Sequence, residues 1–194
     1  MDPTADEYSL ERMRDRMQIQ DLLYRLVRAV DRRDYDAVRD AFHPDGVDDH
    51  GAYSGGFEGY IEFSRKRNET IPSSMHQLSN ILVEFASLDL ALVETYVWSV
   101  QQYPAAARAA LSQFVGNNAP EAAHGVDSLG CARYVDRIER REGRWRIRHR
   151  TVLMDWKAML PLQAPPAAFP MFKPSSRNQE DWLYRERRAL GIGT

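Results

Sequence analysis

The sequence predicts an α+β domain in which helices come first and a curved antiparallel sheet wraps around them. Apolar residues recur at helical spacing in the first third of the chain. After Pro72 they follow the two-residue alternation of strands. Arg141-Glu142-Gly143 has the chemistry of a hairpin turn, so the two alternating stretches that it joins should pair antiparallel. Such a sheet can leave a cavity between itself and the helices.

Three helices are expected in the first part of the chain, over residues 9–31, 35–42 and 57–68. Ser9 is a plausible N-cap of the first helix, and Asp34 opens the second. His43-Pro44-Asp45-Gly46 should stop the second helix, because proline cannot continue the hydrogen-bond ladder and Asp-Gly favours a turn. A short strand over 47–53 and a turn at 54–56 then precede the third helix.

Four strands are expected over residues 75–85, 90–102, 131–140 and 144–156. The connection 104–130 is far longer than a hairpin needs and holds an Ala-rich stretch, 105–114, that predicts a helix. We therefore divide the chain into a domain, 1–156, and a tail, 157–194. The tail is Pro-rich at first and regains helical character over 179–190; we expect it to cover a cavity mouth or reach a neighbouring subunit, the alternative being a trailing tail.

Composition excludes several classes of protein. The 194 residues are 43% hydrophobic and 28% charged, as in one globular domain, and no apolar run is long enough to span a membrane. A net charge of -2 provides no field for nucleic acid. Cys131 is the only cysteine, which excludes an internal disulfide and a thiolate zinc site within one chain. The first residues have no secretion signal, so we expect a cytoplasmic protein.

The predicted helix 9–31 ends in an acid on its apolar face. Asp31 lies four residues beyond Val27 and eight beyond Leu23, which places its carboxylate on the inward side. Burying a carboxylate without a partner would cost roughly several kcal/mol, so the chain should supply a donor elsewhere. The other interpretation is that Asp31 merely closes this helix or caps the next one.

His76 is the best candidate for that donor. It opens the strand predicted over 75–85, where alternation places it on one face with Leu78 and Asn80. An imidazole, with an ordinary pKa of about 6.5, can accept and return a proton near neutrality, and a carboxylate on its second nitrogen fixes the tautomer. The sequence therefore predicts an Asp31–His76 pair in a cavity wall, although a lone histidine at a strand start is more often structural.

Other side chains extend the predicted site. Arg133 and Arg150 lie on the last two strands, and either could place a positive charge where an oxyanion or leaving group develops; the alternative for each is a surface salt bridge. We expect the substrate-binding walls to come from Tyr24, Tyr53, Asn80, Tyr96, Trp98 and Arg133.

The motifs of several common classes are missing. Asp45, Asp48, Asp49 and His50 are crowded together but lack the spacing of a known metal site, so we expect no metal there. The chain has no nucleophile elbow, phosphate-binding Gly-rich loop or dinucleotide fingerprint. This argues against the common hydrolase, kinase and dehydrogenase templates.

Several motifs together resemble the SnoaL-like branch of the nuclear transport factor 2-like superfamily. They are Ile19-Gln-Asp-Leu-Leu23, Ala29-Val-Asp-Arg-Arg-Asp34, Phe42-His-Pro-Asp-Gly-Val47, Met75-His76 and the segment 134–147. The resemblance covers about residues 10 to 156. It implies a cone-shaped α+β fold with a deep pocket, in a superfamily that includes scytalone dehydratase, hexachlorocyclohexane dehydrochlorinase, bile-acid dehydratase, ketosteroid isomerase, polyketide cyclases and diarylpropane lyases.

The resemblance also implies roles for particular residues. In the dehydratase and dehydrochlorinase members an aspartate at the end of the first helix pairs with a histidine that opens the strand after the third helix; Asp31 and His76 occupy these places. Arg150 matches, by its spacing from Trp145, an arginine that assists the leaving group. One departure is Leu26, which stands where the bile-acid dehydratase pattern has a tyrosine, so a phenol acid would have to come from Tyr24, Tyr53 or Tyr96.

The resemblance implies a cofactor-independent lyase that removes a proton from a small hydrophobic aromatic or alicyclic molecule while a neighbouring bond breaks. Two alternatives stay open: an isomerase or cyclase, in which nothing leaves, and a module that only binds a small molecule or a partner protein. A curved sheet has an outer face that must be polar or covered, so we expect a homodimer or homotrimer. We expect no nucleic-acid or membrane partner.

Overall fold

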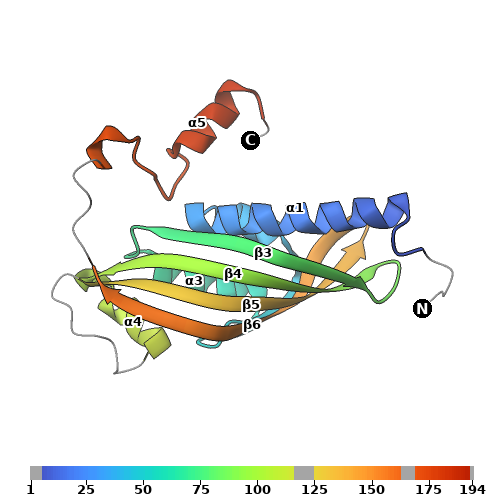
Figure 1. The fold of residues 1–194 in the computed structure, drawn as a ribbon, viewed down its shortest axis with the longest axis horizontal. Coiled ribbons are helices and arrows are strands. Elements are labelled where there is room, and N and C mark those ends of the chain that lie inside the picture. The colour runs from blue at the N-terminus through green and yellow to red at the C-terminus, as the bar shows by residue number, and fades with distance from the viewer. Residues whose placement is uncertain (1–5, 116–124, 163–168, 193–194) are drawn as a thin grey trace.

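The computed structural model describes residues 6–115, 125–162 and 169–192, and it has the predicted α+β architecture (Figure 1). A six-stranded curved sheet has the order β2-β1-β6-β5-β4-β3 and does not close into a barrel. Its strands are β1 (Phe42–Asp49), β2 (Ser54–Gly56), β3 (Ser74–Phe85), β4 (Leu90–Pro104), β5 (Gly125–Arg141) and β6 (Arg144–Pro161).

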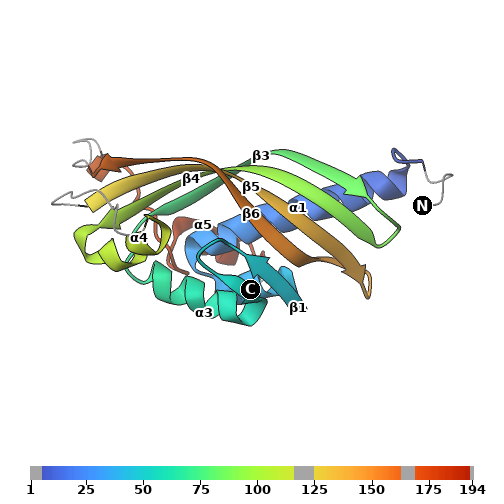
Figure 2. The same ribbon diagram turned by 90° about the horizontal axis from the view of Figure 1, so that it is seen from below.

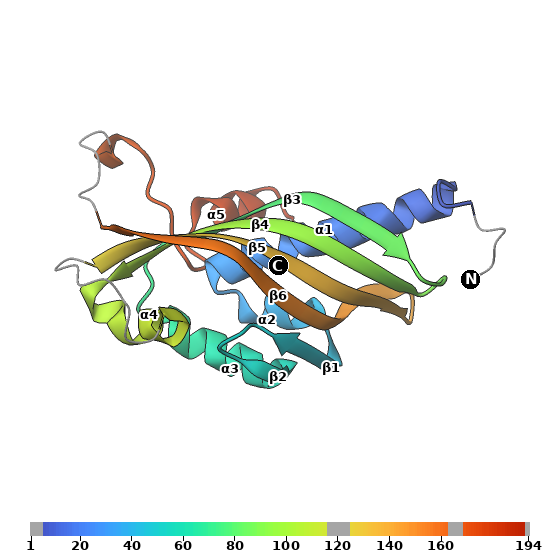
Figure 3. The same ribbon diagram turned by 60° about the horizontal axis from the view of Figure 1, so that its bottom comes forward.

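The helices cover the inner face of the sheet. They are α1 (Leu10–Arg32), α2 (Tyr35–Asp40) and α3 (Phe57–Asn68); α4 (Arg108–Val115) follows a 3₁₀ turn, Ala105–Ala107, at one end, and α5 (Trp182–Ala189) lies in the tail. Figures 2 and 3 show α3 beside β1 and β2, and α1 packs against β3 and β6. Between the helices and the sheet lies one apolar core that includes Ile19, Leu23, Leu26, Ile138 and Ile147.

Local chemistry explains the limits of α1. The Ser9 hydroxyl accepts a hydrogen bond from the Arg12 backbone N–H at 3.3 Å and caps the first turn, as predicted. Arg33 adopts a left-handed conformation at the other end, and its N–H bonds the carbonyl oxygens of Ala29 and Val30. The chain then turns, and the Asp34 side chain caps α2 by accepting from Ala37 N–H.

The four long predicted strands are present and pair antiparallel with their neighbours in the chain. Arg141-Glu142-Gly143 does form part of the hairpin between β5 and β6, with Glu142 and Gly143 at positive φ of 53° and 76°. β6 extends beyond the predicted end at residue 156, to Pro161. β1 pairs in parallel with β6, so the sheet is not wholly antiparallel.

The prediction of a turn at 43–46 is wrong, because this segment belongs to β1. Phe42 pairs with Ile147, and the register shifts before Val47, so the Pro-Asp-Gly sequence makes an irregularity within the strand and not a loop. The buried His43 holds the segment in place through a 3.0 Å hydrogen bond between its Nε2 and the backbone oxygen of Glu139. The nearest contact of a Cβ added at Gly46 would be the His43 oxygen at 2.8 Å, which favours glycine there.

The tail docks beside the C-terminal end of α1. Arg177 is buried, and its guanidinium donates hydrogen bonds to the backbone oxygens of Val30, Asp31 and Ile71. Figure 1 shows α5 lying near the same end of α1. Among the described helices, none is both long and apolar enough to cross a membrane.

Candidate active site

A hydrogen bond joins Asp31 at the end of α1 to His76 near the start of β3. Asp31 Oδ1 lies 2.7 Å from His76 Nδ1, and the backbone N–H of His76 donates to Asp31 Oδ2 at 2.8 Å. Asp31 is only 5% exposed. The carboxylate therefore orients the imidazole through two contacts, and the bond at Nδ1 directs the other ring nitrogen, Nε2, away from Asp31.

A polar chain holds the Asp31 carboxylate. The hydroxyl of Ser74 donates to Asp31 Oδ1 at 3.2 Å, and Gln101 Nε2 donates to the Ser74 oxygen at 3.2 Å. The amide oxygen of Gln101 in turn accepts from the Tyr103 hydroxyl at 2.9 Å and from Arg67 at 3.0 Å. Three donors on one buried carboxylate offset much of the cost of removing it from water.

His76 lines a cavity of about 410 Å³ between the sheet and α3. Its described walls come from the inward faces of β3, β4, β5 and β6, from the segment after β1, and from α3 and α4. The lining residues are His50, Gly51, Ala52, Arg67, His76, Val97, Ser99, Gln101, Gln113, Ala132, Tyr134, Val152, Met154 and Lys157. A small ring-bearing molecule fits a cavity of this size.

Two other ionisable groups in the wall have shifted pKa values. Burial raises the pKa of Tyr134 to about 12, so its phenol keeps its proton over the neutral range. Burial, and to a lesser extent the charge of Arg67, lower the pKa of Lys157 to about 8. The cavity thus contains two imidazoles, a phenol donor and two cationic side chains.

Four predicted substrate-binding residues are absent from the described wall of this cavity. Tyr96, Trp98 and Arg133 line a separate depression. Asn80 is also exposed, although alternation from His76 predicted the inner face. The physical reason is a bulge: Ser79 pairs with Tyr96 but Leu82 pairs with Glu94, so β3 gains a residue, and Asn80 takes a positive φ of 47°.

The remaining predicted residues lie elsewhere. Tyr24 is 52% exposed on the solvent side of α1. Tyr53 packs against the core and donates from its hydroxyl to the Gly56 backbone oxygen at 2.6 Å. Neither is part of the described cavity wall.

Arg150 lies behind that wall. It is buried and makes two hydrogen bonds to Asp136, at 2.8 and 2.6 Å, while its guanidinium lies 4.1 Å from the ring centre of Tyr134. Burial alone would lower the pKa of Arg150, but the charge of Asp136 keeps it above its usual value. Arg150 therefore packs against Tyr134 and is not among the residues of the described cavity wall.

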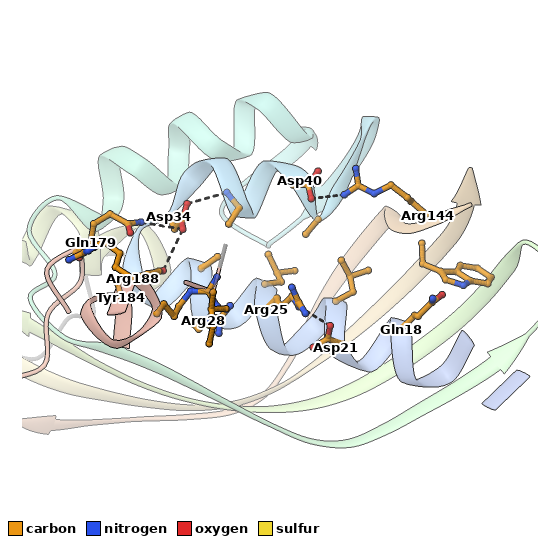
Figure 4. Close-up of a pocket in the computed structure, with 18 of the residues that line it drawn as sticks. Gln18, Asp21, Arg25, Arg28, Asp34, Asp40, Arg144, Gln179, Tyr184 and Arg188 are labelled. Atoms are coloured by element: carbon orange, nitrogen blue, oxygen red, sulfur yellow. Dashed lines mark hydrogen bonds and ion pairs between the residues drawn. The ribbon is translucent and has the colours of Figure 1, made fainter. Parts of the chain in front are cut away.

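A larger cavity, of about 700 Å³, lies between α1, α2 and α5 (Figure 4). Several of its charged side chains already pair with one another: Arg25 with Asp21, and Arg144 with Asp40, each at 2.7 Å. Tyr184 and Gln179 donate to Asp34, as the dashed lines in Figure 4 mark. We place the candidate active site in the smaller cavity because that is where the buried acid–imidazole pair lies.

Sequence reasoning missed two side chains of this region. Arg177 reaches α1 from far along the chain, and no local pattern marks it. His50 had a usable signal, because Asp48 and His50 are two apart on a strand and so share a face.

Asp48 and His50 form a pair of their own, with Asp48 Oδ1 3.0 Å from His50 Nδ1. Asp45 instead lies near Arg141 and Arg148. In the described part of the chain no three His, Cys, Asp or Glu side chains converge as metal ligands would.

These features define a class: α+β proteins in which a curved sheet and its helices enclose a cavity with a buried acid–imidazole pair in the wall. The sequence profile of the SnoaL-like domain matches residues 11–151. The chain belongs to the SnoaL-like domain family, within the nuclear transport factor 2-like superfamily. A search of curated protein sequences gave no match.

Solved structures share the fold. A hexachlorocyclohexane dehydrochlorinase (LinA) Type2 is 23% identical with a TM-score of 0.65, and the alignment covers 81% of this chain and 98% of that one. A putative scytalone dehydratase from Novosphingobium aromaticivorans is 16% identical with a TM-score of 0.62, over 81% and 96%. A putative aromatic ring hydroxylase from the same organism is 25% identical with a TM-score of 0.61, over 76% and 94%. We take these likenesses as evidence for the fold alone.

Proposed function

We propose that this protein is a cofactor-independent lyase that acts on a small hydrophobic aromatic or alicyclic molecule. The observation that carries the proposal is the 2.7 Å contact between Asp31 and His76, with the imidazole in the wall of a cavity. The dehydratase and dehydrochlorinase names of two structures with this fold agree with elimination chemistry.

In this mechanism His76 is the general base. Asp31 accepts the Nδ1 proton, so Nε2 carries the lone pair and faces the substrate; this tautomer is inferred from the hydrogen bond. Nε2 removes a proton from carbon, the electron pair of the C–H bond forms a double bond, and a neighbouring C–O or C–halogen bond breaks with its electrons on the leaving group. Where a C–C bond breaks, the proton comes instead from a hydroxymethyl O–H, formaldehyde leaves, and the C–C electron pair stays on the ring-bearing carbon, which then takes up a proton. Asp31 stabilises the imidazolium that forms. A positioned base supplies about a hundred- to ten-thousandfold in rate.

Tyr134 supplies a second element of the mechanism. Its phenol lines the cavity, stays protonated because burial raises its pKa to about 12, and makes no hydrogen bond with any residue that the structure describes. It is therefore available to donate to an oxygen on which negative charge develops. Tyr134 takes the place expected for Tyr24, Tyr53 or Tyr96.

The test is a screen of purified protein against aromatic and alicyclic alcohols, halides and diols, with products identified by mass spectrometry. An elimination gives a product lighter by water, hydrogen halide or formaldehyde, whereas an isomerisation leaves the mass unchanged. His76→Ala should abolish turnover, and the matched control His149→Ala, on β6 outside the cavity wall, should retain it. Full activity in folded His76→Ala protein would overturn the proposal.

We also propose that copies of this chain associate through the outer face of the sheet. Trp98 and Trp156 are 46% and 49% exposed there, with their ring centres 6.2 Å apart. Arg133 pairs with Glu94 and Asp155 beside them. Exposed aromatic rings bordered by ion pairs are typical of a protein interface.

A further inference from the structure

The cavity wall contains a second imidazole that is anchored by a buried acid. Asp48 Oδ1 lies 3.0 Å from His50 Nδ1, just as Asp31 lies against His76. Both histidines line the same cavity. Neither Nε2 atom makes a hydrogen bond with any residue in the described part of the chain. The cavity thus holds two proton-carrying groups, of which the mechanism above uses one.

The His50 ring is held in place on both sides. It stacks against Tyr60 of α3, with ring centres 5.2 Å apart, and lies 6.4 Å from the ring centre of Tyr134 on β5. Its side chain stays 21% exposed, which leaves one edge open. Packing and the Asp48 contact therefore fix the ring while Nε2 stays accessible from the cavity.

The two acids differ in how their charge is satisfied. Asp31 accepts from His76 N–H, His76 Nδ1 and the Ser74 hydroxyl. The side chain of Asp48 is 1% exposed, and among the described residues its Oδ2 has no hydrogen-bond partner. The guanidinium of Arg150, on which the charge of Asp48 also acts, is already paired with Asp136. The negative charge of Asp48 is therefore directed at His50 more fully than that of Asp31 is at His76.

This difference assigns opposite roles to the two histidines. A buried carboxylate with few other donors stabilises an imidazolium on its neighbour, which suits an acid. A carboxylate that accepts hydrogen bonds from several donors stabilises the neighbouring imidazolium less. A histidine beside such a carboxylate is suited to act as a base. The groups that face His50 are Asp48 near the end of β1, Tyr60 and Tyr134, with Arg150 behind Tyr134.

We propose that His50 is the general acid of this site and donates its Nε2 proton to the leaving group while His76 removes the proton from carbon. The carbon-bound proton goes to His76, its electron pair becomes the new π bond, and the C–O bond breaks with its electrons on oxygen. Oxygen then takes the proton of His50, so that His50 ends neutral and His76 cationic. Transfer of one proton through solvent restores both. The inference rests on the proposed function for its use of His76.

The test uses two ring-opening probes, 1,2-benzisoxazole and 5-nitro-1,2-benzisoxazole, and needs no knowledge of the natural substrate. A base removes the C3 proton, the N–O bond breaks, and a 2-cyanophenol forms. The nitro group further stabilises the departing phenolate, so the parent probe gains more from protonation of that oxygen. Loss of a general acid should therefore slow the parent probe selectively.

The variants are His50→Gln, Asp48→Asn, His76→Ala and the control His149→Gln, each checked for folding by circular dichroism. We expect His50→Gln and Asp48→Asn to lower kcat/KM for the parent probe about tenfold more than for the nitro probe. His76→Ala should lower both by about a hundredfold or more. His149→Gln should change neither.

The outcomes separate the two proposals. If His76→Ala abolishes both reactions but His50→Gln changes both probes by the same factor or not at all, His50 is not the acid and only the base assignment stands. If His76→Ala leaves both rates unchanged, the proposed function fails, and the acid role fails with it. If His50→Gln does not fold, the Asp48→Asn ratio decides.

Discussion

The buried carboxylate of Asp31 determines what the imidazole of His76 can do. Asp31→Asn keeps the size of the side chain but replaces one acceptor oxygen with an amide NH₂ group. This group would face the N–H and O–H groups that now donate hydrogen bonds to Asp31. The ring should rotate or change tautomer, so Nε2 loses its lone pair at the cavity. We expect kcat/KM for 5-nitro-1,2-benzisoxazole to fall by about a hundredfold or more.

The matched control for this prediction is Asp21→Asn on the same helix. Asp21 is exposed and pairs only with Arg25 at 2.7 Å, so its loss should leave the rate and the melting temperature nearly unchanged. A nitrogen-detected NMR spectrum of the histidine rings reports the tautomer directly. Asp31→Asn protein with an unchanged His76 tautomer and rate would contradict the assignment of Asp31 as the orienting group.

Lys157 should make binding of anions at the cavity depend on pH. Its pKa is lowered to about 8, mainly by burial, so its charge is present below that pH and is lost as the pH rises through it. The product 2-cyano-4-nitrophenolate is an anion throughout this range. Its inhibition constant should therefore increase by roughly tenfold between about pH 7 and about pH 9.5.

Substitution isolates this effect from other ionisations. Lys157→Met removes the charge and should flatten the pH dependence of product inhibition above pH about 7. Lys173→Met is the control, because Lys173 lies over the Trp182 ring in the tail and is absent from the cavity wall. A steep dependence that persists in Lys157→Met would assign the effect to another group.

At the scale of elements, Arg177 joins the tail to the end of α1. Its guanidinium donates to the backbone oxygens of Val30, Asp31 and Ile71 and to Asn68 Oδ1. Arg177→Met keeps the apolar stem but leaves these buried acceptors unpaired, which should lower the free energy of unfolding by about 3 kcal/mol. Urea denaturation measures this change.

The same substitution should also affect the site, because the carbonyl of Asp31 is one of the acceptors. Arg185→Met is the control, since Arg185 is exposed and pairs with Glu180 at 3.3 Å. We expect that control to change stability by no more than about 0.5 kcal/mol. Equal stabilities of the two variants would show that the tail contributes little to holding α1.

Patterns with a local cause were predictable from the sequence. The third helix was predicted over 57–68, which are the observed limits of α3. The contact between Asp31 and His76 follows from two periodicities, since helical spacing turns the acid inward and strand spacing turns the ring inward. These arguments need no knowledge of distant residues.

Features with a distant cause were not predictable. The bulge in β3 depends on how Ser79 and Leu82 pair with β4, and it leaves Asn80 exposed and outside the cavity wall. The segment 43–46 has the composition of a turn but becomes part of a strand because β6 lies beside it. Arg150 was expected in the cavity, yet its partner Asp136 on β5 holds it behind Tyr134. The alternation of side chains along a strand predicts which face of the sheet a residue lies on only while the register of the strand is unbroken.

At the scale of the whole molecule, the curved sheet separates two surfaces with different tasks. Its inner face, together with the helices, encloses the cavity that holds both acid–imidazole pairs. Its outer face carries the tryptophans Trp98 and Trp156 and the ion pairs of Arg133. Because neighbouring residues of a strand alternate between the faces, association and chemistry can be changed independently.

This separation leads to a prediction about assembly. If copies associate through the outer face, the double substitution Trp98→Glu and Trp156→Glu places buried, unpaired charge at the interface and should dissociate the oligomer to the 22.4 kDa monomer. Light scattering after size-exclusion chromatography measures the mass. Trp182→Glu is the control, because Trp182 is 46% exposed but belongs to α5 and not to the sheet. Association through this face would be contradicted if the unsubstituted protein is a monomer or if the double variant keeps the oligomeric mass. A monomeric variant that still opens the benzisoxazole ring would show that each chain holds a complete site.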